Sequence, residues 1–382
     1  MRIGIDGIPL VEPRTGVGHY TFELARAHAS LFPSDRFELI SPLPLLASVT
    51  EEISQQNLRA VRLRLNKLLR PWWAIRLPLY IRQSGLDVFH GTNFDVPLWN
   101  MCASVLTIHD LSLFLHSETH EKRLVRRARR RMPLMARTAT MIITPSESVR
   151  RETCDLLRIS PERVVAIPEA ARSCFRPVSE EDAARGRREL NVEDDFILFV
   201  GTIEPRKNLL TLAKAFAEIL RSTPLRPQLV IAGKKGWLTE ELFSYLRGTE
   251  AGERVRFTGY VRDEALAALY SSCKLSVYPS LYEGFGLPAL EAMACGAPLI
   301  TSRTGALMET VGDAARLFDP QDAEGLAANI KELLLSDAAR RELSDKGLKR
   351  ASQFSWEKTA RLTMEVYLEA INRNKAGQYR LR

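Results

Sequence analysis

Residues 282–291 read Tyr-Glu-Gly-Phe-Gly-Leu-Pro-Ala-Leu-Glu and place two glutamates, Glu283 and Glu291, on either side of a glycine-rich turn. Gly284 and Gly286 lack a Cβ, so the backbone of this turn can approach a ligand closely. Pro288 suits the first turn of a helix, where its missing N–H removes no hydrogen bond. The helix that begins there directs unpaired N–H groups and a partial positive charge at the turn, which favours a phosphate.

Apolar runs lie on both sides of this turn. Residues 274–278 read Lys-Leu-Ser-Val-Tyr, and residues 295–302 read Cys-Gly-Ala-Pro-Leu-Ile-Thr-Ser. Together they predict a strand, a loop, a helix and a second strand, with the glutamates near the carboxyl end of the first strand. Open α/β sheets bind ligands at this end. The alternative is the same unit with two solvated glutamates.

The turn and its flanks resemble the retaining glycosyltransferases of the GT-B fold, the family 4-like enzymes of glycosyl transferases group 1. Their hallmark is a pair of glutamates separated by seven residues, as Glu283 and Glu291 are. The resemblance extends over nearly the whole chain. It implies an α/β protein with two doubly wound, Rossmann-like domains that face each other across a cleft, and a C-terminal helix that crosses back to the first domain.

The same resemblance implies roles for the residues of the turn. Glu283 would contact the hydroxyls of the donor sugar, and Glu291 would contact the ribose of the nucleotide. Ionised carboxylates accept hydrogen bonds only, which suits adjacent hydroxyl groups. The remaining residues expected to bind the donor in this turn are Gly284, Phe285, Gly286 and Leu287.

The length of 382 residues predicts two domains, because one hydrophobic core rarely serves so long a chain. We expect them at 1–175, completed by a terminal helix at 360–382, and at 190–359. The polar stretch 172–195 is the expected linker. Five scattered cysteines without paired spacing, a strand at the first residues and no long apolar run favour a cytoplasmic protein.

Two adjacent cations follow an apolar strand in the second half of the chain. Residues 196–202 form the predicted strand, and Arg206 and Lys207 come after it, just before a predicted helix. In the resembled family an arginine and a lysine here neutralise the leaving diphosphate, although Thr202 stands where many members carry arginine. The resemblance also places a nucleobase against the backbone around Tyr260 and Val261.

Two further loops of the first half carry candidate site residues. Gly16 and Gly18 precede an amphipathic helix, and the resemblance places them near the donor diphosphate. Thr21 replaces the third glycine of a dinucleotide fingerprint, which disfavours a Rossmann oxidoreductase. His109 ends an apolar strand, where the family has a histidine against the donor sugar.

The acceptor is expected to meet residues that follow two strands of the first domain. These candidates are His90, Asn93 and Asp110.

Two basic stretches without acids contribute to the net charge of +8. Residues 59–82 hold seven basic residues together with Trp72 and Trp73, and residues 122–137 hold eight. An anionic membrane surface or a lipid-linked acceptor is one expected partner, and nucleic acid is the alternative. A solvated basic face is equally consistent with this pattern.

The residues and the resemblance together predict a hexosyltransferase whose partners are a nucleotide sugar and a glycan or lipid-linked acceptor, with no nucleic acid. The chain lacks the Asp-x-Asp spacing that holds a metal in the other major glycosyltransferase fold, so neither metal nor cofactor is expected. Retention is implied by the resemblance, with front-face attack favoured over an enzyme nucleophile.

The motifs look most like bacterial mannosyltransferases of surface polysaccharide synthesis, such as lipopolysaccharide. GDP-mannose is therefore the first expected donor, before UDP-glucose and UDP-N-acetylglucosamine. The expected location is the cytoplasm, peripheral on the inner face of the membrane.

Overall fold

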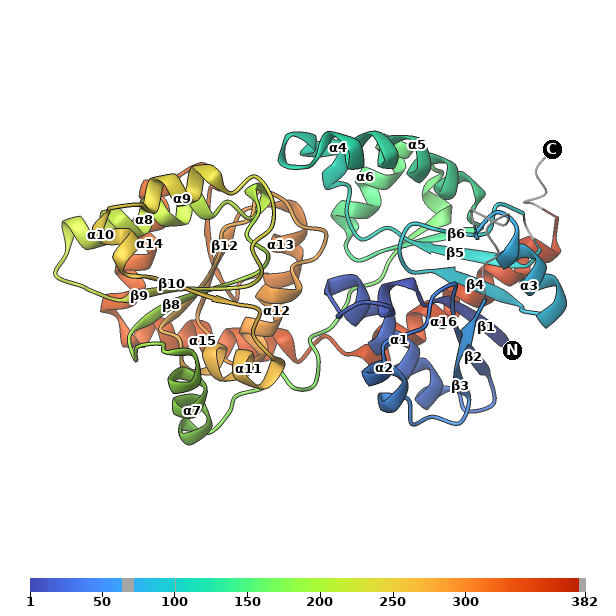
Figure 1. Cartoon of the computed structure of the whole chain (residues 1–382), viewed down its shortest axis with the longest axis horizontal. Coiled ribbons are helices and arrows are strands. Elements are labelled where there is room, and N and C mark those ends of the chain that lie inside the picture. The colour runs from blue at the N-terminus through green and yellow to red at the C-terminus, as the bar shows by residue number, and fades with distance from the viewer. Residues whose placement is uncertain (64–71, 100, 378–382) are drawn as a thin grey trace. The chain divides into compact units, whose positions relative to one another are not determined.

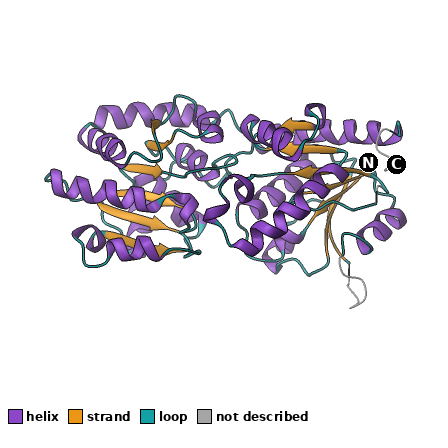
Figure 2. Ribbon diagram, turned by 90° about the horizontal axis from the view of Figure 1, so that it is seen from above, coloured by secondary structure: helices purple, strands orange, loops and turns teal. Residues whose placement is uncertain are grey.

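The computed structural model describes residues 1–63, 72–99 and 101–377, and the chain divides into two compact units (Figure 1). Unit 1 comprises Met1–Phe114, Arg123–Glu169 and Ser355–Arg382. Unit 2 comprises Leu115–Lys122 and Ala170–Phe354. Each unit has the layered α/β organisation that the sequence predicts, with strands between helices (Figure 2).

Within the described residues, unit 1 contains a seven-stranded parallel sheet in the order β3-β2-β1-β4-β5-β6-β7. Its strands are β1 (Arg2–Asp6), β2 (Arg36–Ser41), β3 (Leu58–Arg62), β4 (Val88–Gly91), β5 (Ala103–Thr107), β6 (Met141–Thr144) and β7 (Val164–Ala166). The strand order reverses between β1 and β4. Their carboxyl ends therefore flank the switch point at which such sheets bind ligands.

Helices cover both faces of this sheet because successive strand residues point to opposite sides. Val105 packs toward α1 and α16, whereas Leu106 packs toward α5 and α6. The helices are α1 (Gly16–Leu31), α2 (Ala47–Glu52), α3 (Arg76–Ser84), α4 (Ser112–Leu115), α5 (Lys122–Thr138), α6 (Glu147–Leu157) and α16 (Trp356–Lys375).

The C-terminal helix α16 belongs to unit 1, as expected. It packs against α1 and β5, and it buries Met364, Val366 and Tyr367 in the core of that unit. Burying side chains of this size contributes about 1.5–3 kcal/mol each. The expected range 360–382 ends outside the described residues, since the structure describes the chain as far as residue 377.

Unit 2 contains, in the part of the chain described, a six-stranded parallel sheet in the order β10-β9-β8-β11-β12-β13. Its strands are β8 (Phe196–Val200), β9 (Gln228–Ala232), β10 (Val255–Gly259), β11 (Leu275–Tyr278), β12 (Leu299–Ser302) and β13 (Arg316–Phe318). The switch point lies between β8 and β11. Both segments that the sequence singled out, the cation pair and the glutamate turn, follow these two strands.

The helices of unit 2 share one apolar core with its sheet. They are α7 (Glu180–Leu190), α8 (Leu209–Ser222), α9 (Glu240–Leu246), α10 (Glu250–Glu253), α11 (Asp263–Ser272), α12 (Leu287–Ala294), α13 (Gly305–Val311), α14 (Ala323–Leu335) and α15 (Asp337–Ala351).

The prediction of a linker over 172–195 is wrong, because this stretch folds onto unit 2. Helix α7 packs on α11, and Gly186 lies so close to Ala268 that a Cβ would approach the alanine methyl to 2.5 Å. The charged residues of α7 made the stretch look like a solvated linker, because its buried face is formed only by small residues, Ala183 and Gly186. Unit 2 therefore begins at Ala170, earlier than residue 190, and it ends at Phe354.

Serine side chains cap two of the helices of unit 1. The Ser146 side chain accepts a hydrogen bond from the Val149 N–H at the start of α6, and the Ser355 side chain accepts one from the Lys358 N–H at the start of α16. Such caps satisfy donors that have no partner inside the helix.

Candidate functional site

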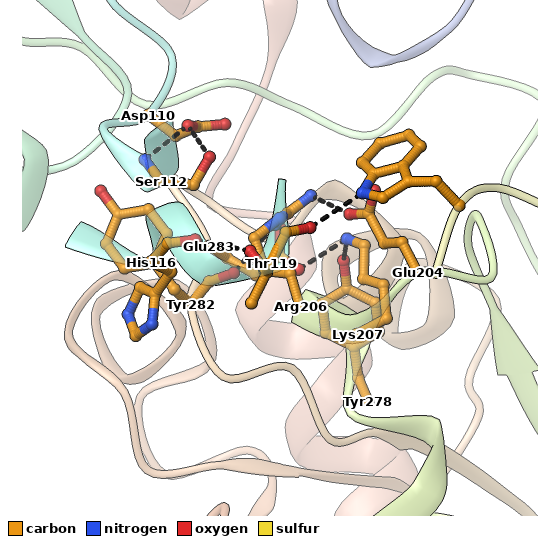
Figure 3. Close-up of polar contacts among 11 residues, drawn as sticks. Asp110, Ser112, His116, Thr119, Glu204, Arg206, Lys207, Tyr278, Tyr282 and Glu283 are labelled. Carbon is orange, nitrogen blue, oxygen red and sulfur yellow. Dashed lines mark hydrogen bonds and ion pairs between the residues drawn. The ribbon is translucent and has the colours of Figure 1, made fainter. Parts of the chain in front are cut away.

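A buried cluster of charges lies at the switch point of unit 2. The Nζ of Lys207 is 2.6 Å from Glu283 Oε1, and a guanidinium nitrogen of Arg206 is 3.1 Å from Glu283 Oε2 (Figure 3). Arg206 also pairs with Glu204 at 2.6 Å, and Lys207 donates to the Tyr278 hydroxyl at 2.7 Å. The two cations that the sequence assigned to a diphosphate and the glutamate assigned to a sugar thus meet in one cluster.

These contacts shift the acid–base behaviour of the cluster. Burial by itself raises the pKa of Glu283, but the charges of Lys207 and Arg206 outweigh it and lower the pKa to about 2. Burial also lowers the pKa of Lys207, while Glu283 opposes that change. The two cations and the two carboxylates balance, so the cluster has no net charge before a ligand arrives.

The glycine turn that carries Glu283 has a backbone that requires glycine. Gly286 has a φ of 97°, and a Cβ there would lie 2.4 Å from Leu307 Cδ2. Helix α12 begins at Leu287 with Pro288 in its first turn, as the sequence predicts. Phe285 is buried, and its carbonyl accepts a hydrogen bond from Thr310 Oγ1 at 2.7 Å. The turn is therefore fixed by a hydrogen bond from α13, which carries Thr310.

Glu291 lies on α12 and pairs with a residue that the sequence did not single out. Its Oε1 is 3.3 Å from a guanidinium nitrogen of Arg172, which also pairs with Asp263. Burial raises the pKa of Glu291 to about 7, although Arg172 opposes this rise. The carboxylate expected to hold the ribose is thus buried and titrates near neutral pH.

The segment expected to meet the nucleobase follows the edge strand β10. Tyr260 is exposed over 58% of its surface, with the Lys234 ammonium 5.4 Å from its ring centre, while Val261 is buried. An exposed ring beside a cation offers a surface on which a planar base can stack.

In unit 1, His109 has a partner on each ring nitrogen. Nε2 lies 2.9 Å from the Thr92 carbonyl oxygen, and Nδ1 lies 3.1 Å from Glu169 Oε1. Burial lowers the pKa of His109, but the hydrogen bond and charge of Glu169 outweigh it, so the net pKa is raised. The ring also meets Tyr20 edge-on at 4.7 Å.

The two glycines of the first loop lie in the first turn of α1, after Thr15 at the N-cap position. Space is open around Gly16, since a Cβ there would meet nothing within 4 Å. At Gly18 a Cβ would approach the Pro9 carbonyl oxygen to 2.8 Å. Gly16 therefore leaves room for a ligand, and Gly18 allows the loop to pack.

The three acceptor candidates have different surroundings. His90 is fully buried, and its ring nitrogens lie 2.7 Å from the Tyr367 hydroxyl and 2.7 Å from Thr107 Oγ1. We correct the acceptor role expected for His90, because its side chain belongs to the core. Asp110 accepts hydrogen bonds from the backbone N–H and the hydroxyl of Ser112, at 2.9 and 2.7 Å, and so supports the turn before α4 (Figure 3).

Asn93 lines a cavity of about 490 Å³ in unit 1, next to the switch point between β1 and β4. Aromatic and aliphatic side chains form most of its wall, and charged side chains form the rest. The lining residues are Ile8, Trp72, Trp73, Asn93, Phe94, Asp95, Leu113, Leu124, Arg127, Ala128, Arg131 and Met132. The cavity suits a ligand with both apolar and polar groups.

The basic stretches differ from the expectation in one respect. Trp72 is 7% exposed and packs in the core with Leu77 and Ile81, so it cannot enter a membrane interface. Trp73 is half-buried beneath the Arg131 guanidinium at 4.6 Å. Arg70, a further cation of the stretch 59–82, lies outside the described residues.

Helix α5 carries the second basic stretch and presents it on the surface. A hollow of about 400 Å³ runs along the helix, and its lining consists of Arg123, Arg126, Arg127, Arg130, Arg131 and Leu134. Of these arginines, Arg131 pairs with Asp95 at 2.6 Å. A hollow with this lining is a favourable place for an anion.

Sequence reasoning missed a segment that borders the charge cluster. Residues 115–122 belong to unit 2 although their neighbours in sequence belong to unit 1. His116 lies 5.3 Å from the Tyr282 ring, and the Thr119 carbonyl accepts a hydrogen bond from the Trp237 indole at 2.8 Å (Figure 3). No local signal in the sequence pairs His116 or Thr119 with residues so distant.

Two further observations concern the whole of the described chain. Residues 1–63, 72–99 and 101–377 contain no group of three or more His, Cys, Asp or Glu arranged to hold a metal ion. In the same ranges no helix has both the length and the apolar character that a membrane crossing requires.

Comparison with known proteins identifies the family. Residues 14–171 match Glycosyltransferase Family 4, and residues 180–350 match Glycosyl transferases group 1. The chain is 32% identical over 380 residues to O-antigen chain mannosyltransferase B of Escherichia coli. The alignment covers 96% of this chain and 99% of that protein. The chain therefore belongs to the glycosyltransferase family that these two models, Glycosyltransferase Family 4 and Glycosyl transferases group 1, describe.

Solved structures show the fold of this glycosyltransferase. Sucrose-phosphate synthase from Thermosynechococcus elongatus superposes with a TM-score of 0.76 at 24% identity, over 97% of this chain and 98% of that one. HepE of Anabaena, in complex with UDP-glucose, superposes with a TM-score of 0.76 at 18% identity, over 96% and 99% of the two chains. The fold is GT-B, as the sequence predicted. The glycosyltransferase assignment leaves no support for the oxidoreductase alternative.

Proposed function

We propose that this glycosyltransferase moves a mannosyl group from GDP-mannose to a saccharide acceptor with retention of configuration. Unit 2 binds the donor in this proposal, and unit 1 binds the acceptor. The observation that carries it is the cluster of Glu283, Arg206 and Lys207 beside the glycine turn of α12. The mannosyl choice is supported by the named activity of the E. coli relative.

The cluster suits a reaction in which negative charge builds on a diphosphate. When the bond between the sugar C1 and the β-phosphate oxygen breaks, its electron pair leaves with the diphosphate. Arg206 and Lys207 turn from Glu283 toward that charge, and the N-terminal end of α12 adds a partial positive charge. Groups that bind more strongly as charge develops lower the barrier, so these residues act on the rate.

Retention follows when the acceptor oxygen attacks C1 from the face that the diphosphate leaves. The acceptor hydroxyl forms the new bond to C1, and its proton passes to the departing diphosphate oxygen. Glu283 holds hydroxyls of the donor sugar, and Glu291 holds the ribose. These steps need no metal, and we extend the proposal to metal-independent transfer.

The donor is tested by measuring which nucleotide binds and which sugar is transferred. We expect GDP to raise the melting temperature more than UDP, since a ligand at a hundredfold its Kd adds about 2.7 kcal/mol to stability. GDP-mannose with a short mannoside acceptor should give an α-linked product by NMR, and EDTA should leave the rate unchanged. Preference for UDP-glucose or UDP-N-acetylglucosamine would overturn the GDP assignment, and a β-linked product would overturn retention.

The acceptor proposed for unit 1 is a glycan carried on a lipid, which reaches the enzyme at an anionic membrane surface on the cytoplasmic side. The lining of the cavity near Asn93 and the arginine hollow on α5 support this choice. Each cation near an anionic membrane contributes about 1 kcal/mol to binding, and salt screens that attraction. Leu134 is exposed in the same hollow and offers an apolar contact.

Membrane binding is tested with phosphatidylglycerol vesicles at low and high salt. Arg126→Glu with Arg130→Glu should reduce vesicle binding at least tenfold, since two attractive charges become repulsive. The matched control is Arg185→Glu with Arg188→Glu on α7. If the wild type fails to bind these vesicles at low salt, the acceptor is soluble, and retention on duplex DNA in the same assay would favour a nucleic-acid partner.

A further inference from the structure

One of the segments through which the chain passes from unit 1 to unit 2 carries a charge on each side. The crossing lies between Glu169 and Ala170, in the sequence Glu169-Ala-Ala-Arg172. Glu169 pairs with His109 inside unit 1, and Arg172 pairs with Glu291 inside unit 2. The partners are 60 and 119 residues away in sequence. Both are residues that the family resemblance assigned to the donor.

Glu169 determines how the His109 ring is held. The Thr92 carbonyl can only accept a hydrogen bond, so Nε2 of His109 must carry a proton. Nδ1 then shares a second proton with Glu169, and Asp110 is the other acid that acts on the ring. The Glu169 side chain is 5% exposed and the His109 side chain is 11% exposed, so little water competes for this hydrogen bond. Without the carboxylate the ring loses one of its two fixed points.

Arg172 determines how the Glu291 carboxylate is held. Its guanidinium is planar and keeps its charge, and it bridges Glu291 and Asp263 while lying over the Phe175 ring at 4.7 Å. The side chain of Arg172 is 11% exposed. A buried carboxylate with a fixed cationic partner has one orientation, which a ribose can then meet without further ordering.

The neighbouring residues show that the segment is anchored rather than loose. Just before Glu169, the Pro168 carbonyl accepts a hydrogen bond from Thr359 Oγ1 at 2.7 Å. Thr359 lies on α16, immediately after the chain has returned to unit 1 at Ser355. A merely structural anchor would explain each ion pair singly. It would not explain why both pairs end on residues assigned to the reaction, since buried ion pairs are weak sources of stability.

We propose that Glu169 and Arg172 are positioning residues for glycosyl transfer, through which one crossover segment orients His109 in unit 1 and Glu291 in unit 2. The inference rests on the proposed function, because it assigns both partners to the donor. Between them, Ala170 is buried and Ala171 packs against the core of unit 2, so both ends of the segment are fixed.

The proposed role of Arg172 in unit 2 is tested with the Arg172→Met variant. The quantity measured is the Kd for GDP, by calorimetry. We expect the Kd to rise at least tenfold and Arg172→Lys, which keeps the charge without the fork, to restore part of the affinity. The matched control is Arg187→Met, since Arg187 is also 11% exposed and pairs with acids in unit 2. The melting temperature of each variant reports its folding. A GDP affinity equal to that of the control would overturn the role of Arg172.

The proposed role of Glu169 in unit 1 is tested with the Glu169→Gln variant. The quantity measured is the titration midpoint of the His109 ring, by ¹⁵N NMR. Loss of the carboxylate should lower the titration midpoint of His109 and reduce kcat at least tenfold, with the Kd for GDP unchanged. The control is Glu38→Gln, because Glu38 is a buried glutamate of unit 1 paired with Arg2 and Arg59. An unmoved midpoint, or a kcat equal to that of the control, would overturn the role of Glu169.

These arms separate the inference from the proposed function. If wild-type protein binds neither GDP nor UDP, the proposed function fails, while the His109 titration still decides whether Glu169 holds the ring. If wild-type protein binds GDP and the Arg172→Met variant binds it equally well, the inference fails and the proposed function stands.

Discussion

Replacing Glu283 by glutamine removes the carboxylate that faces Lys207 and Arg206, with almost no change in volume. The pKa of Glu283 lies at about 2 in the folded protein, against 4.5 for an ordinary glutamate, because the cations outweigh burial. A difference of about 2.5 pH units corresponds to roughly 3 kcal/mol at neutral pH. Breaking a buried ion pair costs about 3–5 kcal/mol, so both routes give a loss near 3 kcal/mol.

The loss should depend on pH in a defined direction. A lowered carboxyl pKa contributes stability that is fully present above 4.5 and disappears as pH falls toward about 2. The Glu283→Gln variant should therefore melt about 6–12 °C below wild type at pH 7, at roughly 2–4 °C per kcal/mol, and the difference should shrink by pH 3. Thermal unfolding followed by circular dichroism at both pH values checks this. The control is Glu193→Gln, whose exposed pair with Arg254 should change the melting temperature little.

The same variant should separate nucleotide binding from transfer. Without Glu283, both cations are available to a diphosphate, so the Kd for GDP should stay equal or fall. The rate of transfer should drop about 10- to 150-fold, because a charged hydrogen bond to the sugar is worth roughly 1.5–3 kcal/mol. A melting temperature equal to wild type, or a tenfold weaker affinity for GDP, would refute the reasoning.

Three further outcomes are expected. Arg206→Gln with Lys207→Met should lower both kcat and the melting temperature. A triple variant that also carries Glu283→Gln should regain the melting temperature without regaining kcat. Burial raises the pKa of Glu291 to about 7. The protonated carboxyl therefore contributes stability that is fully present below pH 4.5 and is lost as pH rises through 7, where Glu291 ionises. Glu291→Gln should therefore melt higher than wild type at pH 8 but not at pH 4, while its Kd for GDP rises at least several-fold. Gly286→Ala should cost about 2–4 kcal/mol in chemical denaturation, since strain at positive φ adds to a steric clash, whereas Gly248→Ala at φ 69° with open space should cost about 1–2 kcal/mol. Equal losses at the two glycines would contradict the clash.

Several features follow from the sequence because they depend on neighbouring residues. Apolar runs of strand length gave the strands on both sides of the glutamate turn, since buried parallel strands read as continuous apolar segments. Ser146 and Ser355 each accept a hydrogen bond from an N–H three residues later, in the first turn of the helix that follows. Gly286 marks a backbone of positive φ that other residues rarely adopt. The placement of Arg206 after β8 likewise needs only the order of elements.

Other features depend on which distant segments meet, and no local pattern contains that information. His90 and Trp72 were expected at ligand surfaces, but Tyr367 of α16 and the side chains around α3 bury them. The segment 172–195 looked like a linker because its buried face uses small residues.

The sequence by itself determined two doubly wound units and the positions of the charged residues along the chain, because strand length, capping and glycine geometry are local. The tertiary structure decided the partners of those charges. Lys207 meets Glu283 only after β8 lies beside β11, and Glu169 meets His109 only after β5 and β7 join one parallel sheet. Ion pairing acts through space, so the acid–base behaviour of a group depends on a neighbour as far away in sequence as the 119 residues between Arg172 and Glu291.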